Sequence, residues 1–359
     1  MKVEVTEILR KLVSFNTIED KENIQIIEWI KSYLTTIGFT FTELIDEETN
    51  KKCLIAEIGN NAQLAFSGHL DTVNATEDWT KNPFDLCIEN DNIYGLGVCD
   101  MKGGIAAFLK ACATLKNQTL KNGVKLFFTY DEEINFSGIK LLLKEKTVVP
   151  KYLILCEPTN LQPVIATKGC IEMKITFYGK SSHSSTPNKG KNAILEAIKF
   201  IEELLKFSIE LQQDKNDIFS VPYTTINIGK IKGGDAINKV PDRCYIEFDA
   251  RTINKEHNII IENKIKDILK KYDSKLNIGI NIPSNINTDN KMIEDIEKLT
   301  QNKRKGENYV TEASFLPESE SVILGLGPVT AHQSDEYIEK SKLDELVKIY
   351  EKILKKYCF

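Results

Sequence analysis

Apolar and polar positions follow two different periods in the first part of the chain, up to about residue 163. Helical periodicity covers residues 20 to 37 and 104 to 116, and short apolar runs typical of buried strands lie near residues 53 to 58, 63 to 68, 124 to 130 and 152 to 156. Alternating helices and buried strands are typical of an α/β sheet covered by helices. We therefore predict a mostly parallel central sheet in this part of the chain.

The pattern changes after about residue 168. Strand-like alternation is followed by an amphipathic helix, two strands, a second helix and a last strand, in the stretches CIEMKITFYG, KNAILEAIKFIEELLKF, TTINIGKI, RCYIEFDAR, IIIENKIKDILKKY and KLNIGINI. This β-α-β-β-α-β order predicts a ferredoxin-like α+β domain. Helical segments and the apolar strand SVILGLG follow it. We therefore predict that residues 167–282 are inserted into a first domain made of residues 1–166 and 283–359.

Composition narrows the class of protein. The chain has 359 residues, of which 42% are hydrophobic and 28% charged, so two domains with substantial cores are expected. A net charge of -5 without a long basic tract argues against a nucleic-acid partner. No apolar run has the length of a membrane span, and the opening segment lacks a cleavable signal pattern. Eight scattered cysteines without a C-x-x-C pair indicate reduced, mostly buried thiols in a cytoplasmic protein.

The stretch FSGHLDTV places His69 and Asp71 two residues apart where a predicted strand ends. The period of two directs both side chains to the same side of that strand. A ligating imidazole commonly donates its second N–H to a carboxylate, which orients the ring. The pair is therefore either a metal ligand with its orienting partner or an ordinary hydrogen-bonded pair.

Acids and a histidine follow other predicted strands as well. Asp131, Glu132 and Glu133 follow KLFFTY, Glu157 follows YLILC, and His332 follows the apolar strand SVILGLG after a short loop. Adjacent acids on a surface loop need no explanation, but at the end of a buried strand they repel one another unless a cation or raised pKa values compensate. Ligand and metal sites form at the carboxyl ends of strands in open α/β sheets. The recurrence of these residues therefore favours such a site.

Asp100 lies in YGLGVCDMKGGIAAFLK, which begins like a dinucleotide-binding loop. Asp100 occupies the third glycine position of that loop, where its charge would repel a pyrophosphate. A carboxylate near the start of the following helix would also complement the helix dipole and the free N–H groups. The residues alone therefore leave Asp100 as a helix-terminal acid or as a further ligand.

Taken in order, SGHLDTV, GLGVCDMKGG, YDEE, CEPTN and AHQSDEY resemble the motifs of the M20 metallopeptidase family of dinuclear zinc amidohydrolases. The resemblance extends over nearly the whole chain and is strongest to the acetylornithine deacetylases of that family. It implies a catalytic domain and an inserted lid through which two chains form a homodimer. It also implies that His69 and Glu157 bind one metal, that Glu133 and His332 bind the other, and that Asp100 bridges them.

The resemblance favours two zinc ions, and a ligand set without thiolate also suits Co²⁺ or Mn²⁺. Two such ions can activate a shared water for attack on an amide carbonyl. The family pattern makes Glu132 the base that carries the proton of this water to the departing amine. It makes Asp71 the partner that orients His69. Members of the family often have a cis peptide bond after the bridging aspartate, here between Asp100 and Met101.

Three residues of the predicted lid match further positions of the family. His183, in GKSSHSSTP, matches a histidine that reaches the active site of the neighbouring subunit and stabilises the oxyanion. Without the resemblance, it would be read as an exposed loop histidine. Asn238 and Arg251 match positions that bind polar groups of the substrate, and a guanidinium pairs well with a carboxylate. His257 fits no motif and is expected at the surface.

The resemblance implies a small N-acyl amino acid as the substrate, and most specifically N2-acetyl-L-ornithine, which would be hydrolysed to L-ornithine and acetate in arginine biosynthesis. Glu312, in TEASF, is the candidate for binding the side-chain ammonium, although an acid of a surface loop or of a helix N-terminus fits as well. TEASF also departs from the TEAPF-like form of the deacetylases. The alternatives are a succinyl-diaminopimelate desuccinylase, an aminoacylase, a dipeptidase and a non-catalytic ligand-binding relative.

Overall fold

The computed structural model describes residues 3–18, 21–288 and 291–359, which form two compact units. The segment 306–314 belongs to the second unit, whereas the sequence analysis placed it in the first domain. One contact that holds this segment is the hydrogen bond from the Lys168 N–H to the Glu307 carbonyl oxygen, at 3.3 Å. Unit 1 comprises Met1–Ile165, Asn287–Lys305 and Phe315–Phe359, and unit 2 comprises Ala166–Ile286 and Gly306–Ser314.

The larger sheet has nine strands. Its order is β1 (Thr40–Ile45), β2 (Lys52–Ile58), β6 (Val124–Thr129), β3 (Leu64–His69), β7 (Tyr152–Leu155), β15 (Glu320–Ile323), β8 (Val164–Thr167) and β13 (Asn285–Ile286), with β14 (Lys305–Glu307) also paired to β8. The four central strands β6, β3, β7 and β15 are parallel. The pairs toward both edges are antiparallel. The prediction of a mostly parallel centre is therefore confirmed.

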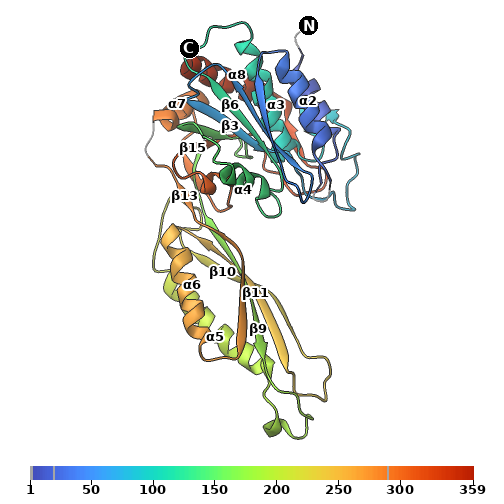
Figure 1. Cartoon of the computed structure of the whole chain (residues 1–359), viewed down its shortest axis with the longest axis vertical. Coiled ribbons are helices and arrows are strands. Elements are labelled where there is room, and N and C mark those ends of the chain that lie inside the picture. Colours follow the sequence, from blue (N-terminus) through green and yellow to red (C-terminus); the bar gives the residue numbers. More distant parts are fainter. Residues whose placement is uncertain (1–2, 19–20, 289–290) are drawn as a thin grey trace. The chain divides into compact units, whose positions relative to one another are not determined.

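Helices flank this sheet (Figure 1). Helix α3 is apolar on nearly every side, and all its residues except Lys110 are buried, as expected for a helix packed between other elements. Phe66 of β3 packs against Phe108 of α3 and Tyr350 of α8, with ring centroids 5.6 and 5.0 Å apart. The helices of unit 1 are α1 (Val5–Val13), α2 (Ile24–Thr35), α3 (Gly103–Cys112), α4 (Ser137–Lys144), α7 (Lys291–Thr300) and α8 (Lys340–Cys358).

A small three-stranded sheet that the sequence analysis did not predict lies in unit 1. Its order is β16 (Tyr337–Glu339), β5 (Asn92–Tyr94) and β4 (Cys87–Glu89), and all its pairs are antiparallel. Tyr337 pairs with Tyr94, so the segment that follows His332 lies beside the segment that precedes Asp100. This pairing connects two parts of the candidate site that are far apart in sequence.

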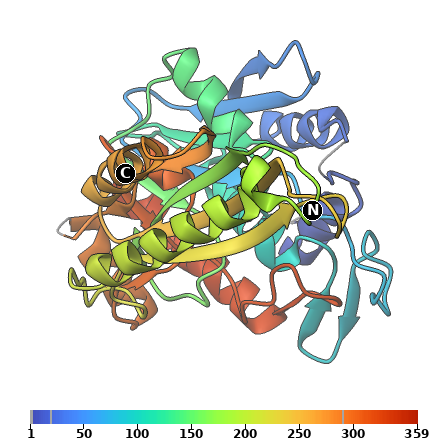
Figure 2. The same cartoon turned by 90° about the horizontal axis from the view of Figure 1, so that it is seen from below.

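Unit 2 contains the predicted β-α-β-β-α-β order. Its antiparallel sheet has the strand order β10-β11-β9-β12, which is the ferredoxin-like order. Both helices pack on one face of this sheet (Figure 1; Figure 2), where Phe177, Phe200 and Phe248 contribute to the core. The elements are β9 (Gly169–Tyr178), α5 (Ala193–Leu211), β10 (Thr225–Gly233), β11 (Arg243–Thr252), α6 (Lys255–Leu269) and β12 (Ser274–Ile282).

Two further expectations concern the whole chain. All eight cysteines are free and all except Cys87 are buried, as the sequence analysis predicts. Within the described ranges, no helix combines the length and the apolar composition that crossing a membrane requires.

Candidate metal centre

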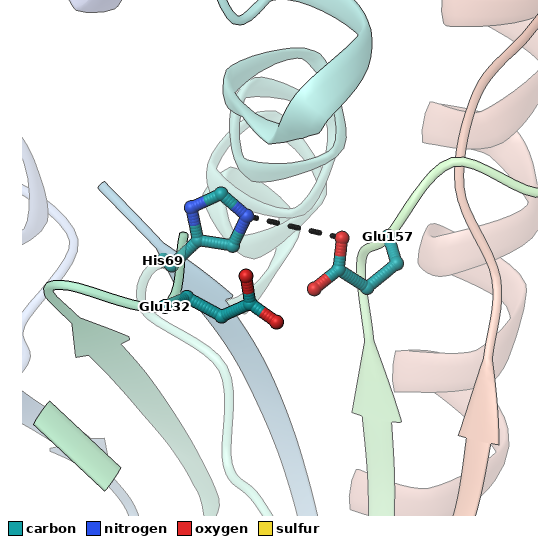
Figure 3. Close-up of side chains that lie close together, drawn as sticks. All are labelled: His69, Glu132 and Glu157. Atoms are coloured by element: carbon teal, nitrogen blue, oxygen red, sulfur yellow. Dashed lines mark ion pairs between the residues drawn. The ribbon is translucent and has the colours of Figure 1, made fainter. Parts of the chain in front are cut away.

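Three neighbouring parallel strands deliver polar side chains to the same edge of the larger sheet. His69 is the last residue of β3, Glu132 and Glu133 follow β6, and Glu157 follows β7. Because these strands are parallel, their carboxyl ends meet. Figure 3 shows the side chains of His69, Glu132 and Glu157 converging from these strand ends.

Asp100 and His332 complete the cluster. His69 Nε2 lies 3.1 Å from Asp100 Oδ1 and 3.8 Å from Glu157 Oε2. His332 Nε2 lies 3.0 Å from Glu133 Oε1 and 3.7 Å from Asp100 Oδ2. The two carboxylate oxygens of Asp100 therefore face two different histidines.

The donor atoms of the cluster fit divalent metal ions. They are imidazole nitrogens and carboxylate oxygens without a thiolate, a set that suits Zn²⁺, Co²⁺ or Mn²⁺. The acids outnumber the histidines at a mostly buried place, and a cation would offset their mutual repulsion. Among the residues that the structure describes, two groups have ligand atoms that all lie within 4.8 Å of one another, namely His69 with Glu132 and Glu157, and His69 with Asp100 and Glu133.

The pKa values reflect the same crowding of charge. Burial, followed by the charge of Asp100, raises the pKa of Glu157 well above its usual range. Burial alone would lower the pKa of His69, but its hydrogen bond with Asp100 helps to raise that pKa well above the usual value. The hydrogen bond with Glu133 raises the pKa of His332 to about 8. A metal bound to both rings would require each imidazolium to lose one proton, because a ligating imidazole is neutral.

Asp71 lies behind His69, on the side of the ring away from the other acids. His69 Nδ1 is 3.0 Å from the backbone carbonyl oxygen of Asp71 and 3.5 Å from its Oδ1. The other carboxylate oxygen, Oδ2, accepts the N–H of Glu133 at 3.1 Å. Asp71 therefore contacts the ring through its main chain as well as its side chain, and it also connects the loop after β3 to the loop after β6.

The turn that carries Asp100 depends on glycines. Asp100 lies in the irregular turn Val98–Lys102 just before α3, and its peptide bond to Met101 is cis. Gly97, which precedes the turn, has a φ of +78°, a conformation that other residues rarely adopt. A Cβ on Gly104 would lie 2.5 Å from the carbonyl oxygen of Cys156, so only glycine lets α3 begin against the end of β7. The DMKGG motif thus allows the turn of Asp100 to approach Glu157.

Comparisons with known proteins agree with this geometry. Residues 65–356 match the family described as peptidase family M20/M25/M40. The chain belongs to this family. It is 32% identical over 374 residues to an acetylornithine deacetylase of Buchnera aphidicola subsp. Schizaphis graminum, covering 99% of this chain and 98% of that relative.

Solved structures of family M20 share the fold of this chain. A tripeptidase from Staphylococcus aureus has a TM-score of 0.81 at 21% identity, covering 98% of this chain and 97% of its own. A dinuclear metal binding peptidase from Bacillus subtilis has a TM-score of 0.71 at 15% identity, covering 98% of each chain.

Two buried lysines that no motif singled out lie beside candidate site residues of this M20 family member. Lys51, the residue before β2, forms a buried ion pair with Asp131, the residue before Glu132. Lys102 donates from Nζ to the Phe15 carbonyl oxygen at 3.1 Å, and burial lowers its pKa to about 7. No signal in the local sequence marks these contacts, because each partner lies about 80 or more residues away along the chain.

In unit 2, the loops of His183 and Asn238 lie side by side. His183 forms an isolated antiparallel bridge with Lys239, and the Ser184 N–H donates to the Asn238 carbonyl oxygen at 3.0 Å. Both predicted site residues are exposed, and His183 Nδ1 is 2.7 Å from the hydroxyl of Ser185. The structure thus brings these two residues of the lid prediction together.

Arg251 and Glu312 have different surroundings. Arg251 is half-buried on β11, and its Nε donates to Asp249 Oδ2 at 2.8 Å. Glu312 begins the short 3₁₀ turn Glu312–Phe315 and is only 2% exposed. The alternative that Glu312 is an acid of a surface loop is therefore wrong.

His257 corrects another expectation. It was predicted at the surface, but it is 1% exposed in the first turn of α6. Its Nε2 is 3.0 Å from Asp214 Oδ2, and its Nδ1 is 2.6 Å from the hydroxyl of Thr224. The prediction failed because the neighbouring residues in the sequence are charged. On a helix such a stretch can expose its charged residues on one face and bury other residues on the opposite face.

Proposed function

We propose that this protein is an amidohydrolase with two divalent metal ions, most specifically Zn²⁺. His69 and Glu157 would hold one ion, and Glu133 and His332 would hold the other. Asp100 would bridge them. The observation that carries this proposal is the direction of the two Asp100 carboxylate oxygens, one toward each histidine, at 3.1 and 3.7 Å.

When bound, the metal ions supply the Lewis acidity that activates water and polarises the scissile carbonyl. Glu132 would accept the proton of the attacking water and deliver it to the departing amine. Its carboxylate lies close to the ligand atoms of His69 and Glu157, within reach of a water at that metal, which supports this role. Asp71 would hold Nδ1 of His69 by a hydrogen bond, so that Nε2 of the ring remains directed at Asp100 and Glu157.

The proposed substrate is N2-acetyl-L-ornithine, which would be cleaved to L-ornithine and acetate. The support is the similarity to acetylornithine deacetylases over nearly the full length of the chain. Arg251 and Asn238 would bind the α-carboxylate, and Glu312 would bind the side-chain ammonium. A buried acid such as Glu312 suits this role, because a carboxylate attracts an ammonium more strongly in a buried place than in water.

A homodimer formed through unit 2 would complete the site. His183 of each subunit would stabilise the oxyanion in the active site of the other. Exposed apolar side chains support such an interface, because large apolar residues at a surface often mark contacts with another protein. On α5 these exposed side chains are Leu195, Ile198, Leu205 and Ile209.

A substrate panel tests the proposed function. We expect kcat/KM to be higher for N-acetylornithine than for N-acetylmethionine, N-succinyl-diaminopimelate or unacylated dipeptides. The Glu312→Gln variant should have a smaller ratio of kcat/KM for N-acetylornithine to kcat/KM for N-acetylmethionine, because the ammonium would lose its charged partner. A preference for the succinylated substrate or for dipeptides would overturn the substrate assignment and leave the metal centre standing. Absence of both metal and turnover would favour a non-catalytic binding protein.

A further inference from the structure

A buried carboxylate that none of the proposed roles uses lies against the turn of Asp100. Glu336 is 2% exposed and follows His332 by four residues. Its Oε1 accepts the backbone N–H groups of Cys99 at 2.7 Å and of Asp100 at 3.0 Å. Its Oε2 accepts the N–H of Gly97 at 2.8 Å.

The N–H groups at the start of a helical turn have no acceptor within the turn, and these three hydrogen bonds supply one for each of them. The turn is irregular, because Gly97 is left-handed and Asp100 has non-helical dihedral angles. Buried backbone N–H groups need acceptors, and leaving them without one is costly. Successive N–H groups of such a turn form a concave site for an anion, which here is supplied by the chain itself. The carboxylate of Glu336 therefore stabilises the conformation that presents Asp100.

The residues before Glu336 make comparable contacts with a different segment. Asp335 accepts the N–H of Thr80 at 2.9 Å, the hydroxyl of Thr80 at 2.6 Å and the N–H of Lys81 at 3.1 Å. Ser334 and Thr76 share a hydrogen bond of 2.7 Å between their hydroxyl groups. In the motif AHQSDEY, two adjacent acids thus accept three hydrogen bonds each, and the side-chain oxygens of Glu336 receive theirs from the Asp100 turn.

We propose that Glu336 is a positioning residue of the metal centre, which holds the Asp100 turn against the segment of His332 so that Asp100 faces both histidines. This inference rests on the proposed function, in which Asp100 and His332 are metal ligands. Glu336 acts through backbone N–H groups and donates no atom to a metal or to substrate. Its effect therefore resembles that of groups that orient ligands, whose loss typically weakens metal binding.

The test compares the wild-type chain with Glu336→Gln and with the control Asp335→Asn. A glutamine retains one carbonyl oxygen, but its amide group opposes one of the N–H donors of the turn. We expect Glu336→Gln to weaken Zn²⁺ binding by about 10- to 100-fold in equilibrium dialysis. The absorption spectrum of the Co²⁺-loaded variant should also change, and kcat should fall more than KM rises. Asp335→Asn carries the same chemical change in the same segment and should retain the affinity and the Co²⁺ spectrum of the wild type.

Each outcome decides the inference. Wild-type Zn²⁺ affinity and an unchanged Co²⁺ spectrum in Glu336→Gln would overturn it while leaving the proposed function intact. Equal losses in Glu336→Gln and Asp335→Asn would also overturn it, because they would indicate general damage to this segment. A wild-type chain that binds no divalent metal would contradict the proposed function itself, together with this inference. Thermal unfolding of the metal-free variants separates a loss of folding from a loss of metal binding.

Discussion

The candidate metal ligands of unit 1 and three predicted site residues of unit 2, His183, Asn238 and Arg251, have very different surroundings. In unit 1, His69 is 1% exposed, and acids that follow three neighbouring strands approach it and one another. In unit 2, His183 and Asn238 are exposed on paired loops, and the guanidinium of Arg251 is matched by Asp249, two residues away. The residues of the first group meet only because segments far apart in the sequence fold together. The polar atoms of the second group find their hydrogen-bond partners in nearby residues or in water.

This difference indicates which side chains already lie close together in the folded chain before any ligand binds. Bringing several acids together in a buried place raises the free energy of the folded chain unless a cation compensates. The exposed residues of unit 2 carry no such cost. In the proposed function, they contribute only when a substrate or a second subunit reaches them. Unit 1 should therefore respond to metal, and unit 2 should respond to association.

Removal of the metals should have the largest effect. We expect exhaustive chelation to abolish amide hydrolysis and added Zn²⁺, Co²⁺ or Mn²⁺ to restore it. A metal at 100 times its Kd stabilises the folded state by about 2.7 kcal/mol, provided that it does not bind the unfolded chain. Hydrogen exchange should then slow around the ends of β3 and β7 and remain unchanged in β9 to β12. Full activity of the metal-free protein would contradict the prediction that the residues of unit 1 act through bound metal.

Removal of the proposed base should have the next largest effect. Glu132→Gln is expected to lower kcat by about 10²- to 10⁴-fold, because the proton transfer from water loses its acceptor. Metal content, measured by elemental analysis, should stay near that of the wild type. Glu133→Gln is the matched control at the adjacent position, and it should lose metal as well as activity. Metal loss in Glu132→Gln would instead make Glu132 a ligand.

The cross-subunit role of His183 can be tested with mixed dimers. His183→Ala alone should lower kcat by about 10²- to 10³-fold, as expected for loss of an oxyanion donor. When it is mixed in equal amounts with Glu132→Ala protein, about a quarter of all sites should have both groups, because half of the dimers are hybrids and each has one complete site. Hybrids that form and stay inactive would refute the role.

Within unit 2, the two histidines should behave in opposite ways. His257 is buried and bonded to Thr224 and Asp214, so His257→Ala should lower the free energy of unfolding by about 1–3 kcal/mol or more. Metal affinity should not change. His183→Ala is the control, because its exposed side chain should contribute little to stability. Urea unfolding of both variants gives the comparison, and equal stabilities would contradict it.

The smallest effect concerns acid stability in unit 1. Hydrogen bonds from Arg304 lower the pKa of Glu297 from 4.5 to about 2. Because the pKa of Glu297 is lower in the folded than in the unfolded chain, its interaction with Arg304 stabilises the folded state above pH 4.5. This contribution to the free energy of unfolding is lost as the pH falls toward about 2. Glu297 is partly exposed, so solvent screening should reduce the contribution to about 1 kcal/mol. Glu297→Gln should remove this part of the pH dependence in urea unfolding, and an unchanged profile would show that the ion pair contributes nothing.

Local patterns predicted the repeating elements well and the irregular contacts poorly. The strands and helices of unit 2 follow clear periods of apolar residues, and their predicted order is found in the sheet β10-β11-β9-β12. The strands β4, β5 and β16 are three residues each and were not predicted. Such short strands form because partners distant in sequence meet, and they leave too few residues for a period to be recognised.

The sequence by itself determined which kinds of residue end the central strands, and therefore the chemistry that this edge of the sheet can perform. The motifs around His69, Asp100 and Glu157 can be read without coordinates, because each consists of neighbouring residues. Only the tertiary structure decided that Glu336 accepts three N–H groups of the Asp100 turn, and that His257 is buried. These outcomes depend on which distant segments pack together, and the free energy of such contacts is set by burial and geometry that no local pattern contains.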